Sequence, residues 1–296
     1  MTLSTRTQDM QQFQHITVRP LSGALGAEVS GVDLSELVSG EVFAEILSAF
    51  HAHPVLFFRA QTLTREHLKV FSARFGPLFR QPNIEAMADD PDVVAVLKEA
   101  DETGISTFGG TWHSDLSYLE TPPLGSVLYA VEVPPRGGDT LWANQYLAYE
   151  TLSRGFREML DGLDCIQVGA PHGVAFAPPA TLALSRSIRL VRGDPEADRE
   201  RLHPTVRTHP ETGRKALYVN PVYSRRFEDM SVEESAPLLG YLFDHATRPE
   251  FCCRFSWRKG DLAVWDNRCT QHLAVNDYDG FRRLMYRTAI AGDRPR

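Results

Sequence analysis

The feature that most constrains this chain is the triplet His113-Ser114-Asp115 together with His272, which lies much later in the sequence. On an extended segment, residues i and i+2 point to the same side. His113 and Asp115 can therefore face one ligand while Ser114 points away. A polar, glycine-containing stretch (101–110) precedes the triplet and a strand-like apolar run (124–131) follows it. The candidate ligands thus lie at a strand or loop boundary, where a rigid sheet can hold them beside a cleft.

Two imidazoles and one carboxylate can occupy one face of an octahedral iron and leave the other positions open. Non-haem Fe(II) oxygenases use this triad. An isolated His-x-Asp triplet is a weak signal, and the same ligand types also suit zinc. Cys269 precedes His272 closely and is a further candidate ligand, although a small buried apolar residue is the simpler interpretation.

Two arginines follow His272 on one predicted strand (282–290). By period two, Arg283, Met285 and Arg287 share a face of that strand. A buried guanidinium needs a partner, so this face either is solvated or lines a cleft that binds anions. The nearby candidate ligands favour the cleft, because arginine binds carboxylates through two parallel hydrogen bonds.

The remaining pattern predicts a mainly β protein with a few helices. Helices are expected at 41–53 with Ser39 as cap, from Thr64 to Phe75, and from the capping box at Ser231 to a point before Pro249. Short strands are expected within 16–34, at 55–58, at 124–131 and at 262–265. Many strands with few covering helices suggest a sandwich or barrel. The irregular segment 171–200 is either functional or a solvated insertion.

Composition limits the function classes. The chain has 296 residues, 43% of them hydrophobic, with a formal net charge of -7. This charge argues against a nucleic-acid or polybasic membrane surface. No apolar run reaches the roughly 18 residues that a membrane span needs. Residues 1–14 are polar and are expected to be a disordered tail, not a secretory signal. Four cysteines make no disulfide framework at this length and fit a reducing cytoplasm.

Several sequence blocks, in consistent order, resemble the taurine dioxygenase family of Fe(II)/2-oxoglutarate-dependent dioxygenases. These blocks include Trp112-His113-Ser114-Asp115, Gly137-Gly138-Asp139-Thr140-Leu141-Trp142 and Thr270-Gln271-His272, together with 25–34, 71–77, 203–210, 217–220 and 265–268. The resemblance covers nearly the whole chain. It looks closest to the taurine and aryloxyalkanoate (phenoxypropionate-type) dioxygenases.

The resemblance implies a single domain over 15–296 that forms a double-stranded β-helix (jelly roll, cupin-like), with helices packed on one sheet and a mobile lid at 171–200. It implies Fe(II) bound by His113, Asp115 and His272. It also implies that Arg283 and Thr140 bind the far carboxylate of 2-oxoglutarate, which reacts with O2 to give succinate and CO2. Relatives of this kind often form dimers or tetramers, so a homo-oligomer is expected.

For the substrate, the resemblance assigns Arg287 to an anionic group. Gln81 and Ile84 stand where the taurine enzyme has a histidine and a tyrosine, and Gly109 stands near the place of an asparagine. These changes remove hydrogen-bonding groups suited to a small zwitterion. Tyr223 matches the aryloxypropionate enzymes, and Leu116, Ile84 and Phe176 can form apolar walls. An organic acid with an apolar or aromatic body is therefore expected. The alternatives are a sulfonate or alkyl sulfate dioxygenase and, in another class, a non-catalytic metal-binding β-helix protein.

Overall fold

The computed structural model describes residues 13–175 and 187–296. Most of the expected tail, the central part of the expected lid and Phe176 lie outside these residues. Within the two described ranges, no helix combines the length and the apolar character that crossing a membrane would require.

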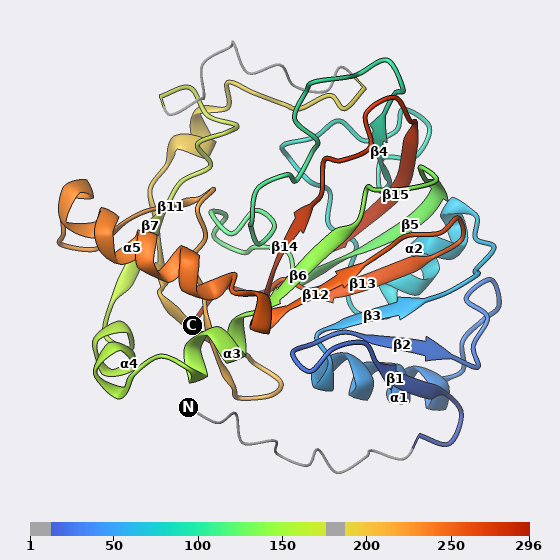
Figure 1. Cartoon of the computed structure of the whole chain (residues 1–296), viewed down its shortest axis with the longest axis horizontal. Coiled ribbons are helices and arrows are strands. Elements are labelled where there is room, and N and C mark those ends of the chain that lie inside the picture. Colours follow the sequence, from blue (N-terminus) through green and yellow to red (C-terminus); the bar gives the residue numbers. More distant parts are fainter. Residues whose placement is uncertain (1–12, 176–186) are drawn as a thin grey trace.

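The larger of two facing sheets has seven strands in the order β1-β2-β3-β13-β5-β15-β4 (Figure 1). Their bounds are β1 Thr17–Pro20, β2 Ala27–Ser30, β3 Val55–Phe58, β4 Val94–Lys98, β5 Gly125–Glu132, β13 Leu262–Asp266 and β15 Arg283–Ile290. Neighbours pair antiparallel except β2 and β3, which are parallel. From β3 to β4, strands of the first half of the chain alternate with the late strands β13 and β15, so the sheet joins residues that are distant in sequence.

The smaller facing sheet has the order β12-β6-β14, with bounds Cys252–Phe255, Thr140–Asn144 and Thr270–Ala274. Its inward side chains pack on the inner face of the large sheet. The Phe57 and Phe255 rings stack with centroids 4.0 Å apart, and Trp142 is completely buried against Phe57 and Trp265. Two mainly antiparallel sheets that share a core in this way form the expected double-stranded β-helix, so the predicted fold class is confirmed.

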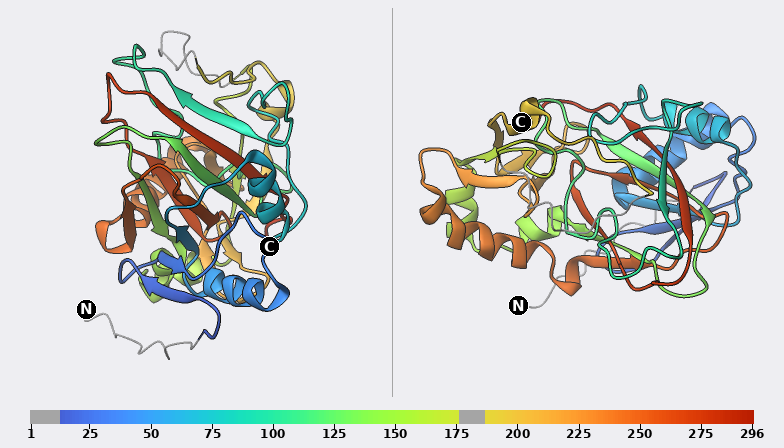
Figure 2. Two further views of the ribbon diagram at one scale, coloured as in Figure 1. Left: turned by 90° about the vertical axis from the view of Figure 1, so that its right-hand side faces the viewer. Right: turned by 90° about the horizontal axis from the view of Figure 1, so that it is seen from above.

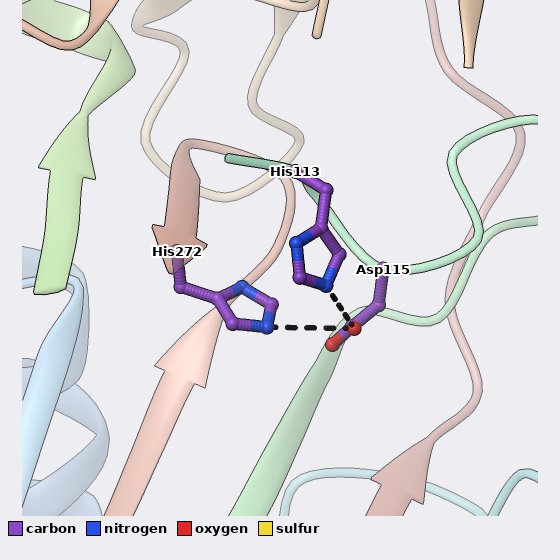
Figure 3. A group of neighbouring side chains, drawn as sticks. All are labelled: His113, Asp115 and His272. Carbon is purple, nitrogen blue, oxygen red and sulfur yellow. Dashed lines mark ion pairs between the residues drawn. The ribbon is translucent and has the colours of Figure 1, made fainter. Parts of the chain in front are cut away.

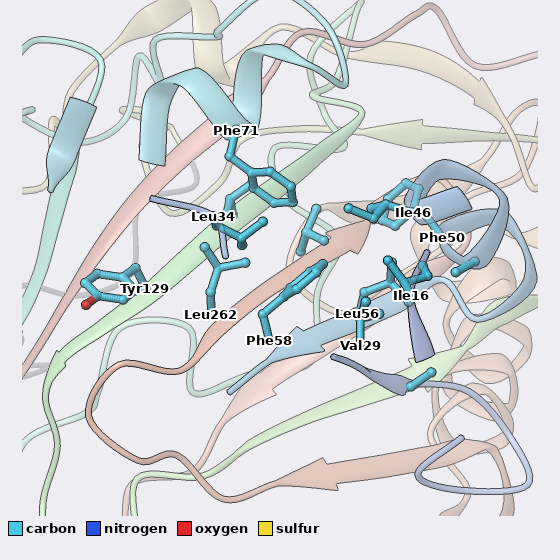
Figure 4. Packing of buried hydrophobic residues seen from close by; sticks show 14 of the residues in the cluster. Ile16, Val29, Leu34, Ile46, Phe50, Leu56, Phe58, Phe71, Tyr129 and Leu262 are labelled. Carbon is cyan, nitrogen blue, oxygen red and sulfur yellow. The ribbon is translucent and has the colours of Figure 1, made fainter. Parts of the chain in front are cut away.

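Two helices cover the outer face of the large sheet. Helix α1 (Gly40–Ala52) is capped by Ser39, and α2 (Arg65–Ala73) is capped by Thr64. Both caps were predicted, and α2 ends two residues before the expected Phe75. Their buried faces join the sheet in one apolar cluster around Phe50, Phe58 and Phe71 (Figure 4). This packing fixes the outer layer and leaves the inner face of the sheet for the site.

A second apolar cluster lies beside the two sheets, on the left of Figure 1 and again apart from them in the view from above in Figure 2. Its apolar side chains come from the helices α3 (Gln145–Glu150), α4 (Arg154–Leu160) and α5 (Val232–Ala246), from the short strands β7 (Asp164–Gln167), β9 (Val206–Thr208), β10 (Lys215–Leu217) and β11 (Ser224–Phe227), and from the 3₁₀ turn η2 (Pro249–Phe251). Strand β8 (Arg201–Pro204) pairs with β7, and the 3₁₀ turn η1 (Pro195–Asp198) contributes Ala197 to a separate small cluster. The predicted capping box at Ser231 opens α5. Helices α3 and α4 were not predicted, because six or seven residues hold too few repeats for a helical period to show.

Candidate metal and anion-binding site

The three predicted metal ligands meet between the two sheets. His272 lies on β14, and His113 pairs with it through two backbone hydrogen bonds of 3.1 and 2.8 Å. Asp115 follows in the next turn. The Nε2 atoms of both histidines lie 3.6 Å from Asp115 Oδ1 (Figure 3). One ligand atom from each residue lies within 4.8 Å of the others, and all three side chains are buried.

The protonation state of these side chains suits a metal. The Nδ1–H group of His113 donates to the carbonyl of Thr111 at 2.7 Å, which leaves the Nε2 atom to face the shared site. Burial and the neighbouring His113 hold the pKa of His272 well below its usual value, so its ring is neutral at pH 7. At 3.6 Å the Nε2 atoms are too far from the carboxylate for hydrogen bonds. A neutral His272, a second imidazole whose Nε2 atom faces the same point, and a carboxylate that bonds to neither ring fit a divalent cation.

The second oxygen of Asp115 is occupied by other partners. Arg287 donates to Oδ2 of Asp115, and Ser126 Oγ donates to the same oxygen at 3.1 Å. Burial opposes ionisation of Asp115, but the adjacent Arg287 guanidinium holds the pKa of this carboxyl well below its usual range. Asp115 is therefore an anion whose Oδ1 atom is left to the metal. The contact with Arg287 was not predicted from the sequence.

Arg283 is a buried cation without an anionic partner in the described residues. The residue is 4% exposed, its Nε atom has no hydrogen-bond partner in the structure, and burial lowers its pKa. Its side chain lies against Gly138, where an added Cβ would come within 3.3 Å of Arg283 Cδ and Nε. Gly138 has a φ of +69° and belongs to the turn that leads into Thr140. The turn thus brings the predicted pair, Arg283 and Thr140, into one region.

This arrangement fits the carboxylate of 2-oxoglutarate chemically. An unpaired buried guanidinium is costly, and a bidentate carboxylate removes that cost. The Thr140 hydroxyl accepts a hydrogen bond from Trp257 Nε1 at 3.0 Å, so its own hydrogen remains available to a ligand. A 2-oxoglutarate carboxylate bound here would therefore contact the positive charge of Arg283 and the hydroxyl donor of Thr140.

Three of the predicted substrate residues line one cavity of about 210 Å³. Gln81, Ile84 and Arg287 form part of its wall, and Phe79 and Val94 are among its apolar members. Because Arg287 also contacts Asp115, this guanidinium links the cavity to the metal ligands. The cavity therefore ends in a positive charge beside the candidate metal site.

The other two predicted substrate residues lie in a neighbouring cluster, not in the wall of this cavity. Leu116 and Tyr223 pack with Tyr118, and Phe79 joins the cluster to the cavity. The Tyr223 hydroxyl contacts the backbone of Leu116, which has a φ of +48° directly after Asp115. Gly109, noted in the sequence, lies beside the metal site, since a Cβ there would be 3.4 Å from His113 Cε1.

Two contributions to the site were missed at the level of sequence. Ser126 bonds both Asp115 and Arg287, and its signal was a hydroxyl within the otherwise apolar run 124–131. Phe79 carried no signal, because nothing in its local pattern separates a cavity wall from an ordinary core position.

A second group of metal-type side chains, His209, Asp266 and Cys269, also converges. Here Arg268 already neutralises the carboxylate, with Nε and Nη2 donating to the two oxygens of Asp266 at 2.9 and 2.7 Å. His209 Nε2 donates to the same carboxylate at 3.0 Å. Burial raises the pKa of the Cys269 thiol well above its usual value. The group is therefore an ion-pair network, which supports the view that Cys269 is not a ligand.

The site and the jelly roll together define a 2-His-1-carboxylate protein. The family model described as "Taurine catabolism dioxygenase TauD, TfdA family" matches residues 17–289. The chain belongs to this family, and with it to the α-ketoglutarate (2-oxoglutarate)-dependent dioxygenases, which use Fe(II) and O2. The resemblance seen in the sequence is confirmed.

Relatives with different substrates are about equally similar. An α-ketoglutarate-dependent sulfate ester dioxygenase of Pseudomonas putida is 33% identical, covering 95% of this chain and 91% of that protein. An α-ketoglutarate-dependent 2,4-dichlorophenoxyacetate dioxygenase of Cupriavidus pinatubonensis is 32% identical over 94% of this chain and 98% of its own. A crystal structure described as a putative α-ketoglutarate-dependent taurine dioxygenase from Burkholderia xenovorans superposes with a TM-score of 0.79 at 38% identity, covering 95% of this chain and 94% of that chain. The sequence identities to these relatives therefore do not distinguish a sulfate ester, an aryloxyalkanoate and taurine as the substrate.

Proposed function

We propose that this protein hydroxylates a small organic anion with an apolar or aromatic body, such as an aryloxyalkanoate, and forms succinate and CO2 from 2-oxoglutarate. The observation that carries the proposal is the position of Arg287, between the cavity and the carboxylate of Asp115. A substrate anion bound there would hold its carbon skeleton next to the candidate metal site.

In this proposal each residue has a separate task. His113, Asp115 and His272 would hold Fe(II), which supplies oxygen activation when bound. Arg283 and Thr140 would bind the far carboxylate of 2-oxoglutarate and orient it, and Arg287 would orient the substrate anion. The two arginines are four residues apart on one strand, or about 13 Å at strand rise. That separation allows each arginine to serve a different anion.

The cavity supports an apolar body for the substrate. Phe79, Ile84 and Val94 provide hydrophobic contact, and the cavity volume of about 210 Å³ exceeds the roughly 150 Å³ that suffices for benzene in an engineered cavity. Gln81 is a weaker partner for a sulfonate than a histidine, because it cannot carry a positive charge. An aryl or alkyl acid therefore fits better than taurine.

A sulfate ester or sulfonate is the second candidate, favoured by the similarity to the sulfate ester dioxygenase. Arg287 can bind a sulfate as well as a carboxylate, and the apolar wall can hold an alkyl chain. The reaction class is the same for both candidates.

The test is an anaerobic loading with Fe(II) and 2-oxoglutarate, followed by oxygen and a panel of acids, with succinate release as the readout. Phenoxypropionates, alkyl sulfates and taurine form the panel, and acetate is the control for uncoupled turnover. Preference for the phenoxy acids supports the proposal, and preference for taurine over every apolar acid contradicts it. Assembly as a homo-oligomer remains a prediction, which sedimentation of the purified protein would test.

A further inference from the structure

Two buried polar side chains near the cavity form a pair with unused hydrogen-bonding capacity. Asn83 and His172 are 6% and 5% exposed, and Asn83 Nδ2 lies 3.3 Å from His172 Nε2. Asn83 Oδ1 and His172 Nδ1 have no hydrogen-bond partner in the structure. Buried polar atoms nearly always have partners, so two orphaned atoms on adjacent side chains call for a ligand or a water.

The pair lies where the cavity wall meets the aromatic cluster. Asn83 stands between Gln81 and Ile84, which both line the cavity. The His172 ring centroid is 6.2 Å from that of Tyr118 and 6.4 Å from that of Tyr223. Asn83 is thus a sequence neighbour of the cavity wall, and His172 lies near the aromatic cluster that contains Leu116, the residue after Asp115.

Backbone contacts hold both partners in place. The carbonyl of Asn83 accepts from the Val191 amide at 2.9 Å. The amide of His172 donates to the Gly169 carbonyl at 2.8 Å, and the carbonyl of His172 accepts from the Asp194 amide at 3.1 Å. The two side chains are therefore presented by anchored segments and are preorganised for a ligand.

The chemistry of the pair selects an uncharged partner. If the Asn83 amide donates to His172 Nε2, then His172 Nδ1 carries a hydrogen and Asn83 Oδ1 is a free acceptor. If the amide nitrogen and oxygen of Asn83 are exchanged, the Asn83 amide becomes the free donor and His172 Nδ1 the free acceptor. The pair therefore offers one donor and one acceptor in both orientations. Burial, first of all, lowers the pKa of His172 to about 4, so the ring is neutral at pH 7. A carboxylate or sulfate needs donors only, whereas a hydroxyl or carboxamide both donates and accepts.

We propose that Asn83 and His172 form a polar subsite that binds a hydroxyl or carboxamide group of the substrate while Arg287 binds its anion. This inference rests on the proposed function and narrows its substrate class to organic anions that carry a neutral hydrogen-bonding group. A buried water on the same atoms is the competing occupant, in which case the pair would only join two segments of the fold.

The test compares 2-phenoxypropionate with its ortho-, meta- and para-hydroxyl and carboxamide derivatives, and hexyl sulfate with 6-hydroxyhexyl sulfate. The wild-type enzyme should prefer at least one substituted member of a series by about tenfold in KM, the effect of a buried hydrogen-bonding pair. His172→Phe keeps a ring but removes both nitrogens, and Asn83→Leu removes the amide. Both variants should lose the preference and keep the KM of the unsubstituted acid, and His172→Gln should restore part of the preference.

A matched control is His245→Phe. His245 is also a buried histidine, with Nε2 donating to the Ala148 carbonyl at 2.8 Å and Nδ1 without a hydrogen-bond partner in the structure, but it belongs to α5 and its partner Ala148 belongs to α3. This variant should lose stability and keep the substrate preference. The comparison separates an effect on recognition from the general effect of losing a buried imidazole.

A wild-type enzyme without preference in either series overturns the subsite, as do His172→Phe and Asn83→Leu variants that lose only stability. The second result would identify a buried water as the occupant. Failure of the proposed function looks different, because then no acid promotes succinate release. Calorimetric binding of the same acids to the Mn(II)- and 2-oxoglutarate-loaded protein still decides the subsite in that case, since it needs no turnover.

Discussion

The substitution Arg283→Lys tests the co-substrate site most directly. Lysine keeps the positive charge but replaces the planar, two-pronged guanidinium by a compact ammonium group that cannot bind a carboxylate in the same bidentate way. Arg283 is 4% exposed and its Nε atom has no hydrogen-bond partner in the structure, so a bound carboxylate would supply the pairing that this buried guanidinium lacks. Loss of one charged hydrogen bond costs about 1.5–3 kcal/mol. The Kd of 2-oxoglutarate should therefore rise roughly 10- to 150-fold.

Anaerobic calorimetry on the Mn(II)-loaded protein measures this Kd without turnover. Arg282→Lys is the matched control, because Arg282 is the preceding residue but is partly exposed and pairs with Glu99 and Glu132. It should leave 2-oxoglutarate binding unchanged. An unchanged Kd in Arg283→Lys, with the metal still bound, would refute the assignment of this arginine.

Three further predictions concern the metal, the substrate and the fold. His272→Ala should abolish metal-dependent succinate release while the circular dichroism spectrum stays that of the wild type; retained activity would remove His272 from the ligand set. Arg287→Ala should raise the KM of the organic acid about tenfold or more, since a charged contact is lost, whereas the calorimetric Kd of 2-oxoglutarate should hardly change; the opposite pattern would exchange the roles of the two arginines. Arg268→Met leaves the buried Asp266 without its main counter-charge and should reduce the free energy of unfolding in urea by about 3–5 kcal/mol. The exposed pair of Arg154 with Glu158 provides the control, as Arg154→Met should cost less than about 1 kcal/mol; equal losses in these two variants would contradict the importance of the Asp266 network.

Elements with a strong local signal could be predicted from the sequence. Ser39, Thr64 and Ser231 each cap the helix that was expected of them, because capping depends on a few adjacent residues. The candidate metal ligands were predicted in the same way, from a triplet and one later histidine, and these three side chains converge in the structure. Helices α3 and α4 escaped detection, because they are too short to repeat a pattern and are stabilised by packing in the second apolar cluster.

Contacts between the sheets carried no such local signal. Period two correctly placed Arg283 and Arg287 on one face of β15, and the structure shows that both are buried. It could not show that Arg287 contacts Asp115. That contact depends on tertiary packing, because Arg287 lies on the large sheet whereas Asp115 follows His113, which pairs with the small sheet. The pairing of Asn83 with His172 has the same origin, since a cavity wall and the loop after β7 meet only in the folded chain.

The position of Arg287 has a consequence for the substrate assignment. Its guanidinium already neutralises Asp115, so a substrate anion bound at Arg287 would share this cation with the candidate metal ligand. A shared guanidinium binds a second anion less strongly than a free one, because part of its charge is already compensated. Affinity must then come from the apolar wall around Ile84 and from any neutral hydrogen bonds at Asn83 and His172. This balance favours an acid with a sizeable, partly apolar body over a small zwitterion, for which the anion would have to supply most of the binding energy.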